Sequence, residues 1–240
     1  MKLQKLYSIT RQAIDDYSMI QKGDKIAIGI SGGKDSLTLL YALSGLKRFY
    51  PEAFELTAIT VDLGYEGFHL EEIQALCKEL QVPYSIVKTE IATILSDTHQ
   101  KGNSCSLCAK LRKGALNEEA IRLHCNKIAY AHHADDLLET MMLSLIFEGR
   151  FHSFSPMTKL NRTNLTVIRP LMYLMEADII GFARKQNLPI VSNPCPLDGI
   201  TQRAYAKNLI REINLAHPGA KKRMLTAILN GNMEDWPIRN

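Results

Sequence analysis

Short apolar runs alternate with longer amphipathic stretches along most of the chain. The runs are rich in β-branched residues, and each leads into polar residues and then a stretch whose apolar positions recur every three or four residues. They lie at residues 25–30, 56–62, 83–89, 127–133 and 165–171. Strands that alternate with helices imply right-handed crossovers and parallel pairing. The pattern predicts an α/β fold: a doubly wound parallel sheet of about five strands with flanking helices.

The chain has 240 residues, enough for one main core, so we expect a single domain over residues 1–240. A polar, basic and glycine-containing segment at about 97–116 interrupts the alternation, and we interpret it as an inserted loop that leads into a helix. Two further amphipathic patterns predict a C-terminal helical cap over about 200–240.

Composition places the chain among folded globular proteins. Hydrophobic residues make up 46% and charged residues 22%, which excludes a disordered polyelectrolyte. No apolar run approaches the roughly 18–20 residues that a membrane helix needs, so we expect a soluble, cytoplasmic protein with no membrane partner. The net charge of +4 fits a polyanionic partner but does not identify one.

A phosphate-binding loop is predicted directly after the first strand. Its residues are Ser31, Gly32, Gly33, Lys34, Asp35 and Ser36. Two residues without Cβ let backbone N–H groups approach an anion, the following helix adds partial positive charge, and Lys34 adds a full one. The spacing is not that of a Walker A loop. The alternative is a Gly-Gly turn in which Ser36 only caps the helix.

This loop resembles the pyrophosphate-binding loop (PP-loop) of the ATP pyrophosphatases, whose fold is of the adenine nucleotide α-hydrolase type. The resemblance implies that ATP is cleaved between its α and β phosphates, with Lys34, Asp35 and a magnesium ion neutralising the leaving group. Asp135, after the fourth strand, is a candidate to help them. Asp62 and His132 also follow strands and are candidates to bind ATP. The alternatives are a helix cap at Asp135, a turn cap at Asp62 and a structural role for His132.

The N-terminal pattern is not that of a signal peptide, so we expect the five cysteines to be reduced thiols rather than a disulfide framework. Cys105 and Cys108 form a CxxC pair, which structural zinc sites, redox pairs and iron–sulfur clusters all use. Cys195 follows alone in a proline-containing segment. We expect Cys77 and Cys125 to be core residues, because they lie among apolar neighbours.

Several segments in order resemble the tRNA 2-thiocytidine synthetase family. They are the phosphate loop, CSLCAKLRKGAL at 105–116, AHHADDLLET at 131–140, IRPLMYLMEADI at 168–179, and Cys195 followed by Gln202-Arg203. The resemblance implies an enzyme that adenylates a tRNA base, cytidine 32, releases pyrophosphate and replaces the base oxygen with sulfur. It also implies a [4Fe-4S] cluster bound by Cys105, Cys108 and Cys195, with one iron free of protein ligands.

The same resemblance implies two partners, a tRNA and a sulfur donor such as a cysteine desulfurase or sulfide. A homodimer is compatible with this resemblance. The residues expected to contact RNA are Lys110, Arg112, Lys113 and Arg203, although such basic residues can also form solvated faces. The alternatives are another tRNA-modifying enzyme with this loop, thiouridine-forming or lysidine synthetase-like, and a zinc-stabilised RNA-binding protein.

Overall fold

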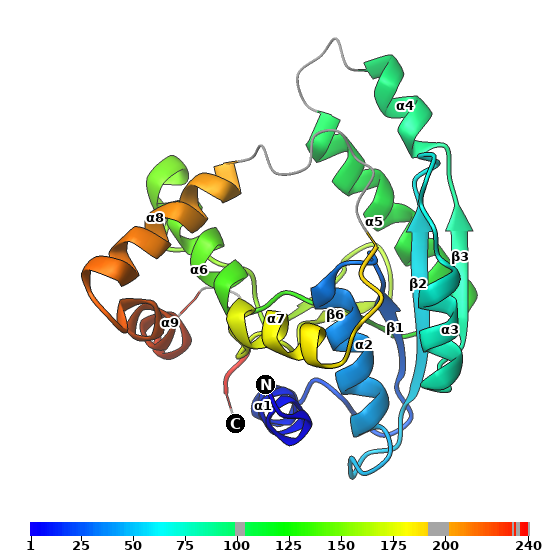
Figure 1. Cartoon of the computed structure of the whole chain (residues 1–240), viewed down its shortest axis with the longest axis horizontal. Coiled ribbons are helices and arrows are strands. Elements are labelled where there is room, and N and C mark those ends of the chain that lie inside the picture. Colours follow the sequence, from blue (N-terminus) through cyan, green and yellow to red (C-terminus); the bar gives the residue numbers. More distant parts are fainter. Residues whose placement is uncertain (99–103, 192–201, 232, 234–235, 240) are drawn as a thin grey trace.

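A computed structural model describes residues 1–98, 104–191, 202–231, 233 and 236–239 (Figure 1). Its centre is a six-stranded sheet in the order β3-β2-β1-β4-β6-β5. The strands are β1 (Lys25–Gly29), β2 (Glu55–Asp62), β3 (Tyr84–Lys88), β4 (Lys127–Ala129), β5 (Met157–Lys159) and β6 (Thr166–Ile168). Five of them pair in parallel, and β5 alone runs antiparallel, against β6. The α/β fold is confirmed, with an edge strand, β5, that the sequence pattern did not predict.

Helices cover both faces of this sheet. They are α1 (Leu3–Asp16), α2 (Lys34–Leu46), α3 (Glu71–Glu79), α4 (Ile91–Thr98), α5 (Ser104–Arg122), α6 (Ala134–Leu143), α7 (Glu176–Lys185), α8 (Gln202–Ala216) and α9 (Ala220–Asn230), with a π-helical turn, η2 (Ser144–Glu148), after α6. Among the described residues, no helix is both long and apolar enough to cross a membrane.

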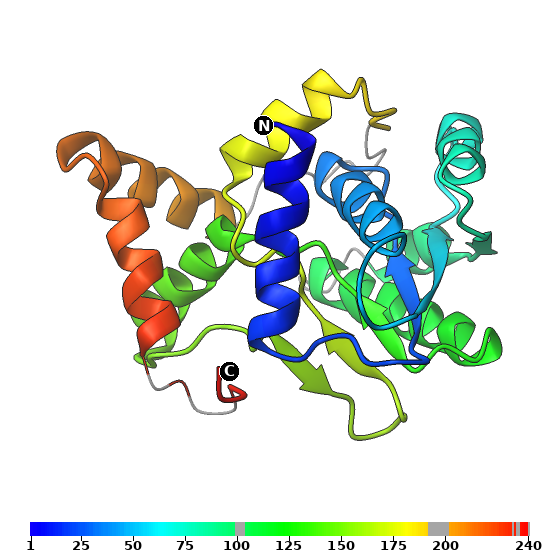
Figure 2. The same ribbon diagram turned by 90° about the horizontal axis from the view of Figure 1, so that it is seen from below.

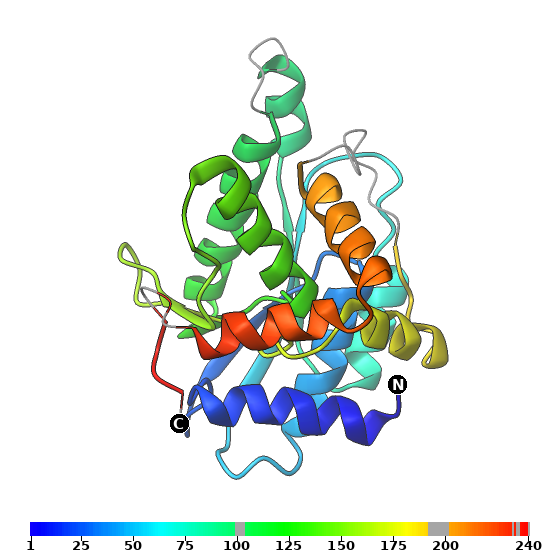
Figure 3. The same ribbon diagram turned by 90° about the vertical axis from the view of Figure 1, so that its left-hand side faces the viewer.

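Successive side chains of each strand point to opposite faces of the sheet, so the hydrophobic core has two parts. Ile26 and Ile28 of β1 pack in one cluster with residues of α1, α2 and α7, whereas Ala27 between them packs on the opposite face with residues of α4 and α5. Figure 2 shows α1, α2 and α7 side by side. Figure 3 shows α8 and α9 packed against α6 in the helical C-terminal part of the chain.

The segment expected to be an inserted loop at about 97–116 is different in the structure. Residues 104–116 belong to α5, a helix of 19 residues, so the CxxC motif lies on a helix. Leu116 and Ala120, toward the C-terminal end of α5, are buried against the sheet and anchor it there. The N-terminal half of α5 extends beyond the carboxyl ends of the strands (Figure 1).

The strand order reverses between β1 and β4, because the chain leaves β1 toward β2 on one side while β4 pairs on the other. In open α/β sheets ligands bind beyond the carboxyl ends of the strands at such a switch point. The segments that follow β1 and β4 therefore meet where the sequence predicts a phosphate site.

Candidate active site

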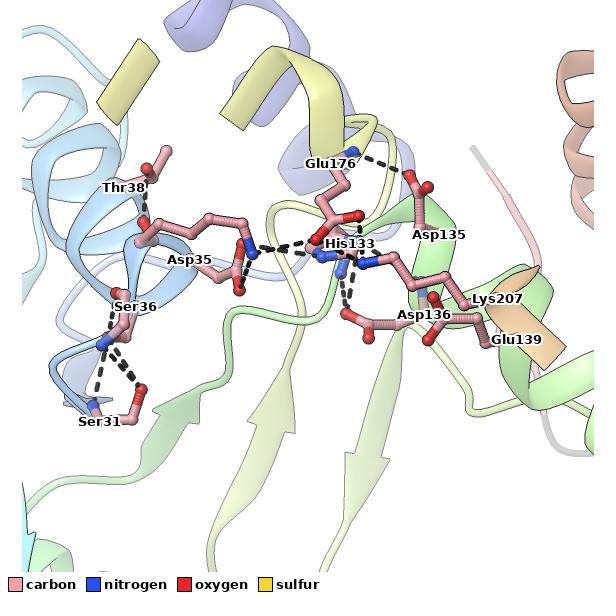
Figure 4. Close-up of polar contacts among 12 residues, drawn as sticks. Ser31, Asp35, Ser36, Thr38, His133, Asp135, Asp136, Glu139, Glu176 and Lys207 are labelled. Carbon is pink, nitrogen blue, oxygen red and sulfur yellow. Dashed lines mark hydrogen bonds and ion pairs between the residues drawn. The ribbon is translucent and has the colours of Figure 1, made fainter. Parts of the chain in front are cut away.

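The predicted phosphate loop forms a compact turn between β1 and α2. Gly32 has a φ of +84°, and a Cβ there would lie 3.2 Å from the Cβ of Val191, so this position requires glycine. The Ser36 hydroxyl donates to the Gly33 carbonyl at 2.9 Å and accepts from the Ser31 backbone N–H at 3.2 Å (Figure 4). No side chain caps α2 at Gly33, so the helix terminus is left open to an anion.

Lys34, the first residue of α2, lies between two carboxylates. Its Nζ is 3.1 Å from Asp35 Oδ2 and 3.1 Å from Glu176 Oε1. Burial alone would lower the pKa of Lys34, but the two carboxylates outweigh it and raise the pKa, so the ammonium stays charged. Glu176 also pairs with Lys207 of α8 at 2.7 Å. Glu176 is not among the predicted site residues, although it lies within the motif at 168–179.

Asp35 has one unsatisfied oxygen. Its Oδ1 is buried and has no hydrogen-bond partner in the part of the chain that is described, with His133 Nε2 3.7 Å away. His133 caps α6: its Nδ1 accepts from the Asp136 N–H, and its own N–H donates to Asp136 Oδ2 at 2.9 Å. Because Nδ1 accepts, neutral His133 carries its proton on Nε2, toward Asp35. A buried carboxylate oxygen without a partner suits a bound cation.

Asp135 and Asp136 point in different directions. Asp135 is buried, accepts from the Glu176 N–H at 2.8 Å and pairs with Lys221 of α9. Asp136 lines the cavity described below and pairs with Arg203 at 3.0 Å. Asp135, expected to act in catalysis, thus ties α6 to α7 and α9, whereas its neighbour faces the site (Figure 4).

Arg203, expected to contact RNA, pairs with carboxylates of α6 in the structure. Besides Asp136, its Nη1 lies 3.5 Å from Glu139 Oε2. Burial and the nearby Asp136 raise the pKa of Glu139 to about 7, so this carboxyl titrates near neutral pH. In the described structure, Arg203 therefore joins α8 to α6.

A cavity of about 730 Å³ borders the phosphate loop, Asp35 and Asp136. It lies at the carboxyl ends of β1, β2 and β4 and is bounded by the phosphate loop and α5. Its lining includes Ser31, Gly33, Asp35, Ser36, Ile59, Val61, Leu63, Phe68, Arg112, Lys113, Tyr130, His132, Asp136 and Arg169. Asp62, expected to bind ATP, accepts from the Gly64 N–H at 3.0 Å in the turn after β2. Its neighbours Val61 and Leu63 form an apolar wall there.

The CxxC motif lies beside this cavity. Cys105 is exposed and Cys108 half-buried, and Arg112 and Lys113 on the next turn of α5 line the cavity. Two thiols three residues apart lie on one face of a helix and can bind one metal or cluster. Cys195 lies outside the described residues, and within them no group of three potential ligands is assembled. Lys110, also expected to contact RNA, is exposed on α5.

The other two cysteines are buried, as expected. Burial raises the pKa of Cys77 to about 11 and also raises that of Cys125, so neither thiol is prepared to bind metal as a thiolate.

Comparison with known proteins gives the family. A model of the PP-loop domain family matches residues 3–216. Two tRNA-cytidine(32) 2-sulfurtransferases are similar to the chain over most of its length. The protein of Geobacter sulfurreducens is 38% identical over 233 residues, 96% of this chain and 91% of the relative. That of Geotalea daltonii is 40% identical over 222 residues, 91% and 88% of the two chains.

The chain belongs to the tRNA 2-thiocytidine synthetase family. The resemblance inferred from its motifs is thereby confirmed. A solved structure with a similar fold is the U34-tRNA thiolase NcsA from Methanococcus maripaludis with its [4Fe-4S] cluster. It has a TM-score of 0.73 and 24% identity, covering 92% of this chain and 76% of that one. The fold of this 2-thiocytidine synthetase family member is therefore similar to that of this tRNA thiolase.

Proposed function

We propose that this chain uses ATP to adenylate the O2 oxygen of a tRNA cytidine, at position 32 as in its relatives, and that sulfur then replaces this oxygen. That the chain is a tRNA sulfurtransferase follows from its family. The observation that carries the mechanism is a cavity that is lined both by the phosphate loop and by α5, the helix with the CxxC motif. An adenylated base in this cavity lies within reach of both.

The phosphate loop serves the first half-reaction. The base oxygen attacks the α-phosphorus, and the bond from that phosphorus to the oxygen of the leaving pyrophosphate breaks. Backbone N–H groups in the first turn of α2 and the charged Lys34 stabilise the growing negative charge on pyrophosphate. The apolar wall formed by Ile59, Val61 and Leu63 suits the adenine ring.

Asp35 and Asp136 are the carboxylates that would hold magnesium. Both line the cavity, and Oδ1 of Asp35 lacks a hydrogen-bond partner among the described atoms. Magnesium is usually bound through one or two carboxylates and the substrate phosphates. His133 lies beside this carboxylate, with its Nε2 3.7 Å from Asp35 Oδ1.

Cys105 and Cys108, together with Cys195, would hold the [4Fe-4S] cluster beside the adenylated base. When bound, the cluster supplies an iron without a protein ligand, to which sulfur from a desulfurase or sulfide can attach. In the second half-reaction a C–S bond forms at C2 of the base and the C2–O bond breaks, so AMP leaves with the oxygen. Arg112 and Lys113 at the cavity offset the charge of RNA phosphates nearby.

The test is formation of 2-thiocytidine in tRNA by anaerobically purified protein given ATP, magnesium, sulfide and a reductant. We expect Lys34→Ala to slow ATP-dependent pyrophosphate release by at least about 100-fold, because one preorganised charge at the leaving group contributes on this scale. Lys47→Ala, at the exposed far end of the same helix, is the matched control and should retain the rate. Circular dichroism checks that both variants fold.

An absence of 2-thiocytidine in tRNA incubated with the cluster-loaded wild-type protein would refute the proposed function. Wild-type rates in Lys34→Ala would remove the loop from the mechanism but leave the product assignment intact. Iron and acid-labile sulfide, measured against zinc in the same sample, separate a cluster enzyme from a zinc-stabilised RNA-binding protein.

A further inference from the structure

The end of the cavity at β4 and β6 contains a buried cation without a counter-ion. Arg169, which follows β6, is 8% exposed and lines the cavity. Its Nη1 donates to the Ser155 carbonyl at 2.6 Å and to Thr158 Oγ1 at 3.1 Å, and its Nε donates to His132 Nδ1 at 3.3 Å. All of these acceptors are neutral. Within the described residues no carboxylate lies at ion-pair distance from Arg169.

This guanidinium remains available for a ligand. Burial lowers the pKa of Arg169 to about 10, so it is still charged at neutral pH. Its Nη2 nitrogen has no protein partner among the described residues, although the other two nitrogens are fixed by hydrogen bonds. Burying a cation is costly unless an anion compensates it, and Arg offers paired donors suited to phosphate oxygens.

Tyr130 provides a second, independent sign of a ligand at the same place. Its hydroxyl is buried without a hydrogen-bond partner in the described structure, and the residue lines the cavity. Burial raises the pKa of Tyr130, so the hydroxyl stays protonated and can donate. Arg169 after β6 and Arg112 of α5 line the same cavity as Tyr130, so two guanidinium groups from different elements border it there.

His132 orients this group of residues rather than adding charge. Burial and Arg169 lower the pKa of His132 to about 4, so the ring is neutral. Its Nδ1 accepts from Arg169, and its ring stacks near Phe154 with centroids 4.9 Å apart. The fixed imidazole holds the guanidinium plane in place.

We propose that Arg169, Tyr130 and Arg112 form an anion corner that binds a phosphodiester of the RNA strand beside the nucleotide being modified. This inference rests on the proposed function. The ATP phosphates have their own site in the loop after β1, and β6 lies two strands from β1, about 10 Å away at ordinary strand spacing. A nucleotide extruded into the cavity brings its backbone phosphate with it, and such contacts fix its position.

Two variants and a control test the anion corner. Tyr130→Phe removes only an oxygen without a described partner, so the melting temperature should not fall. Arg169→Gln removes the charge. Arg162→Gln is the matched control, since it removes an exposed arginine from the β5–β6 hairpin outside the cavity. The measured quantities are the Kd for an anticodon stem-loop without ATP and the Kd for ATP without RNA.

We expect Tyr130→Phe to weaken RNA binding roughly three- to tenfold, as for one lost hydrogen bond. Arg169→Gln should weaken it about tenfold or more, as for a charge-assisted pair, and Arg162→Gln less than about twofold, as for an exposed charge. ATP affinity should be unchanged in all three. A neutral methylphosphonate at the linkage next to the target should weaken binding to the wild type, but cause no further loss in Arg169→Gln.

The possible outcomes distinguish a failure of the anion corner from a failure of the proposed tRNA thiolation. Weaker ATP or AMP binding with unchanged RNA binding would assign the anion to the nucleotide and overturn the RNA corner. If the wild type thiolates tRNA and both Tyr130→Phe and Arg169→Gln bind RNA normally, the anion corner is also overturned, but the proposed function stands. A wild type that neither binds nor thiolates tRNA would end both. If Arg169→Gln fails to fold, Tyr130→Phe decides alone.

Discussion

Glu176 allows a quantitative prediction, because one carboxylate joins the phosphate loop to α8. It pairs with Lys34 at 3.1 Å and with Lys207 at 2.7 Å, and its side chain is only 16% exposed. Burial would raise the pKa of Glu176, but hydrogen bonds from Lys207 and Lys34 lower it to about 2, against an ordinary value of 4.5. The charged form is therefore strongly preferred in the folded protein.

The pKa difference sets the size and the pH range of the effect. At about 1.4 kcal/mol for each pKa unit, the ionised Glu176 contributes up to about 3 kcal/mol to the free energy of unfolding at pH 7. Since the folded pKa is the lower one, this contribution is complete above pH 4.5 and is lost as pH falls from 4.5 to 2. Glu176→Gln retains the shape of the side chain and removes the charge, so it should lower stability by about 1–3 kcal/mol at pH 7.

Urea unfolding at pH 7, 5, 4 and 3 measures this. The difference between wild type and Glu176→Gln should be constant from pH 7 to 5 and decrease below pH 4.5. Glu72→Gln is the matched control, because Glu72 is also a glutamate in the first turn of a helix but is exposed. A Glu176→Gln variant as stable as wild type at pH 7, or a difference that does not change with pH, would contradict the assignment of Glu176 as the ionised link between the two lysines.

Two further predictions concern the metal and the RNA. Cys105→Ala should lose the iron and the thiolation activity, whereas Cys125→Ala should keep its iron and lose about 1 kcal/mol of stability, the scale of a small buried cavity. Iron analysis and urea unfolding measure these effects. Iron retained in Cys105→Ala would contradict the assignment of Cys105 as a ligand. Raising salt from low to physiological concentration should weaken tRNA binding several-fold through counterion release, as measured by fluorescence anisotropy. An affinity that does not change with salt would exclude the basic residues of α5 as an RNA-binding surface.

The parallel strands could be predicted because each is a concentrated run of β-branched and apolar residues flanked by polar ones. The edge strand β5 could not be predicted, since Met157–Lys159 is three residues long, shows no alternation and forms only by antiparallel pairing with β6. Its position matters because Arg169 donates to Thr158 of this strand. A short edge strand thus helps to hold a residue of the cavity.

The helical form of the CxxC segment was also missed, for a different reason. The residues near Cys105 are polar and basic, and Gly114 interrupts the pattern, so local propensity favours a loop. The residues that stabilise α5, Leu116 and Ala120, follow the glycine within two turns and pack on the sheet. Tertiary packing therefore decides the conformation of a segment whose own sequence is ambiguous.

The choice between Asp135 and Asp136 shows what a motif leaves undetermined. Adjacent residues on a helix point about 100° apart, so one of two neighbouring carboxylates faces the cavity and the other does not. The sequence gives no sign of which one does, because the answer depends on α7 and α9, which supply the Glu176 N–H and Lys221 to Asp135.

The charges around the cavity are arranged unevenly, and this arrangement suggests how two polyanions share one site. At the α6–α7 end, each cation has a carboxylate partner, as Lys34 has in Asp35 and Glu176. At the α5–β6 end, Arg112 and Arg169 have no carboxylate partner among the described residues. A phosphate chain in the loop competes with carboxylates for Lys34, which favours a ligand that brings magnesium with it. On the proposed function, RNA phosphates would bind at the other end, where the charge is uncompensated, without displacing ATP.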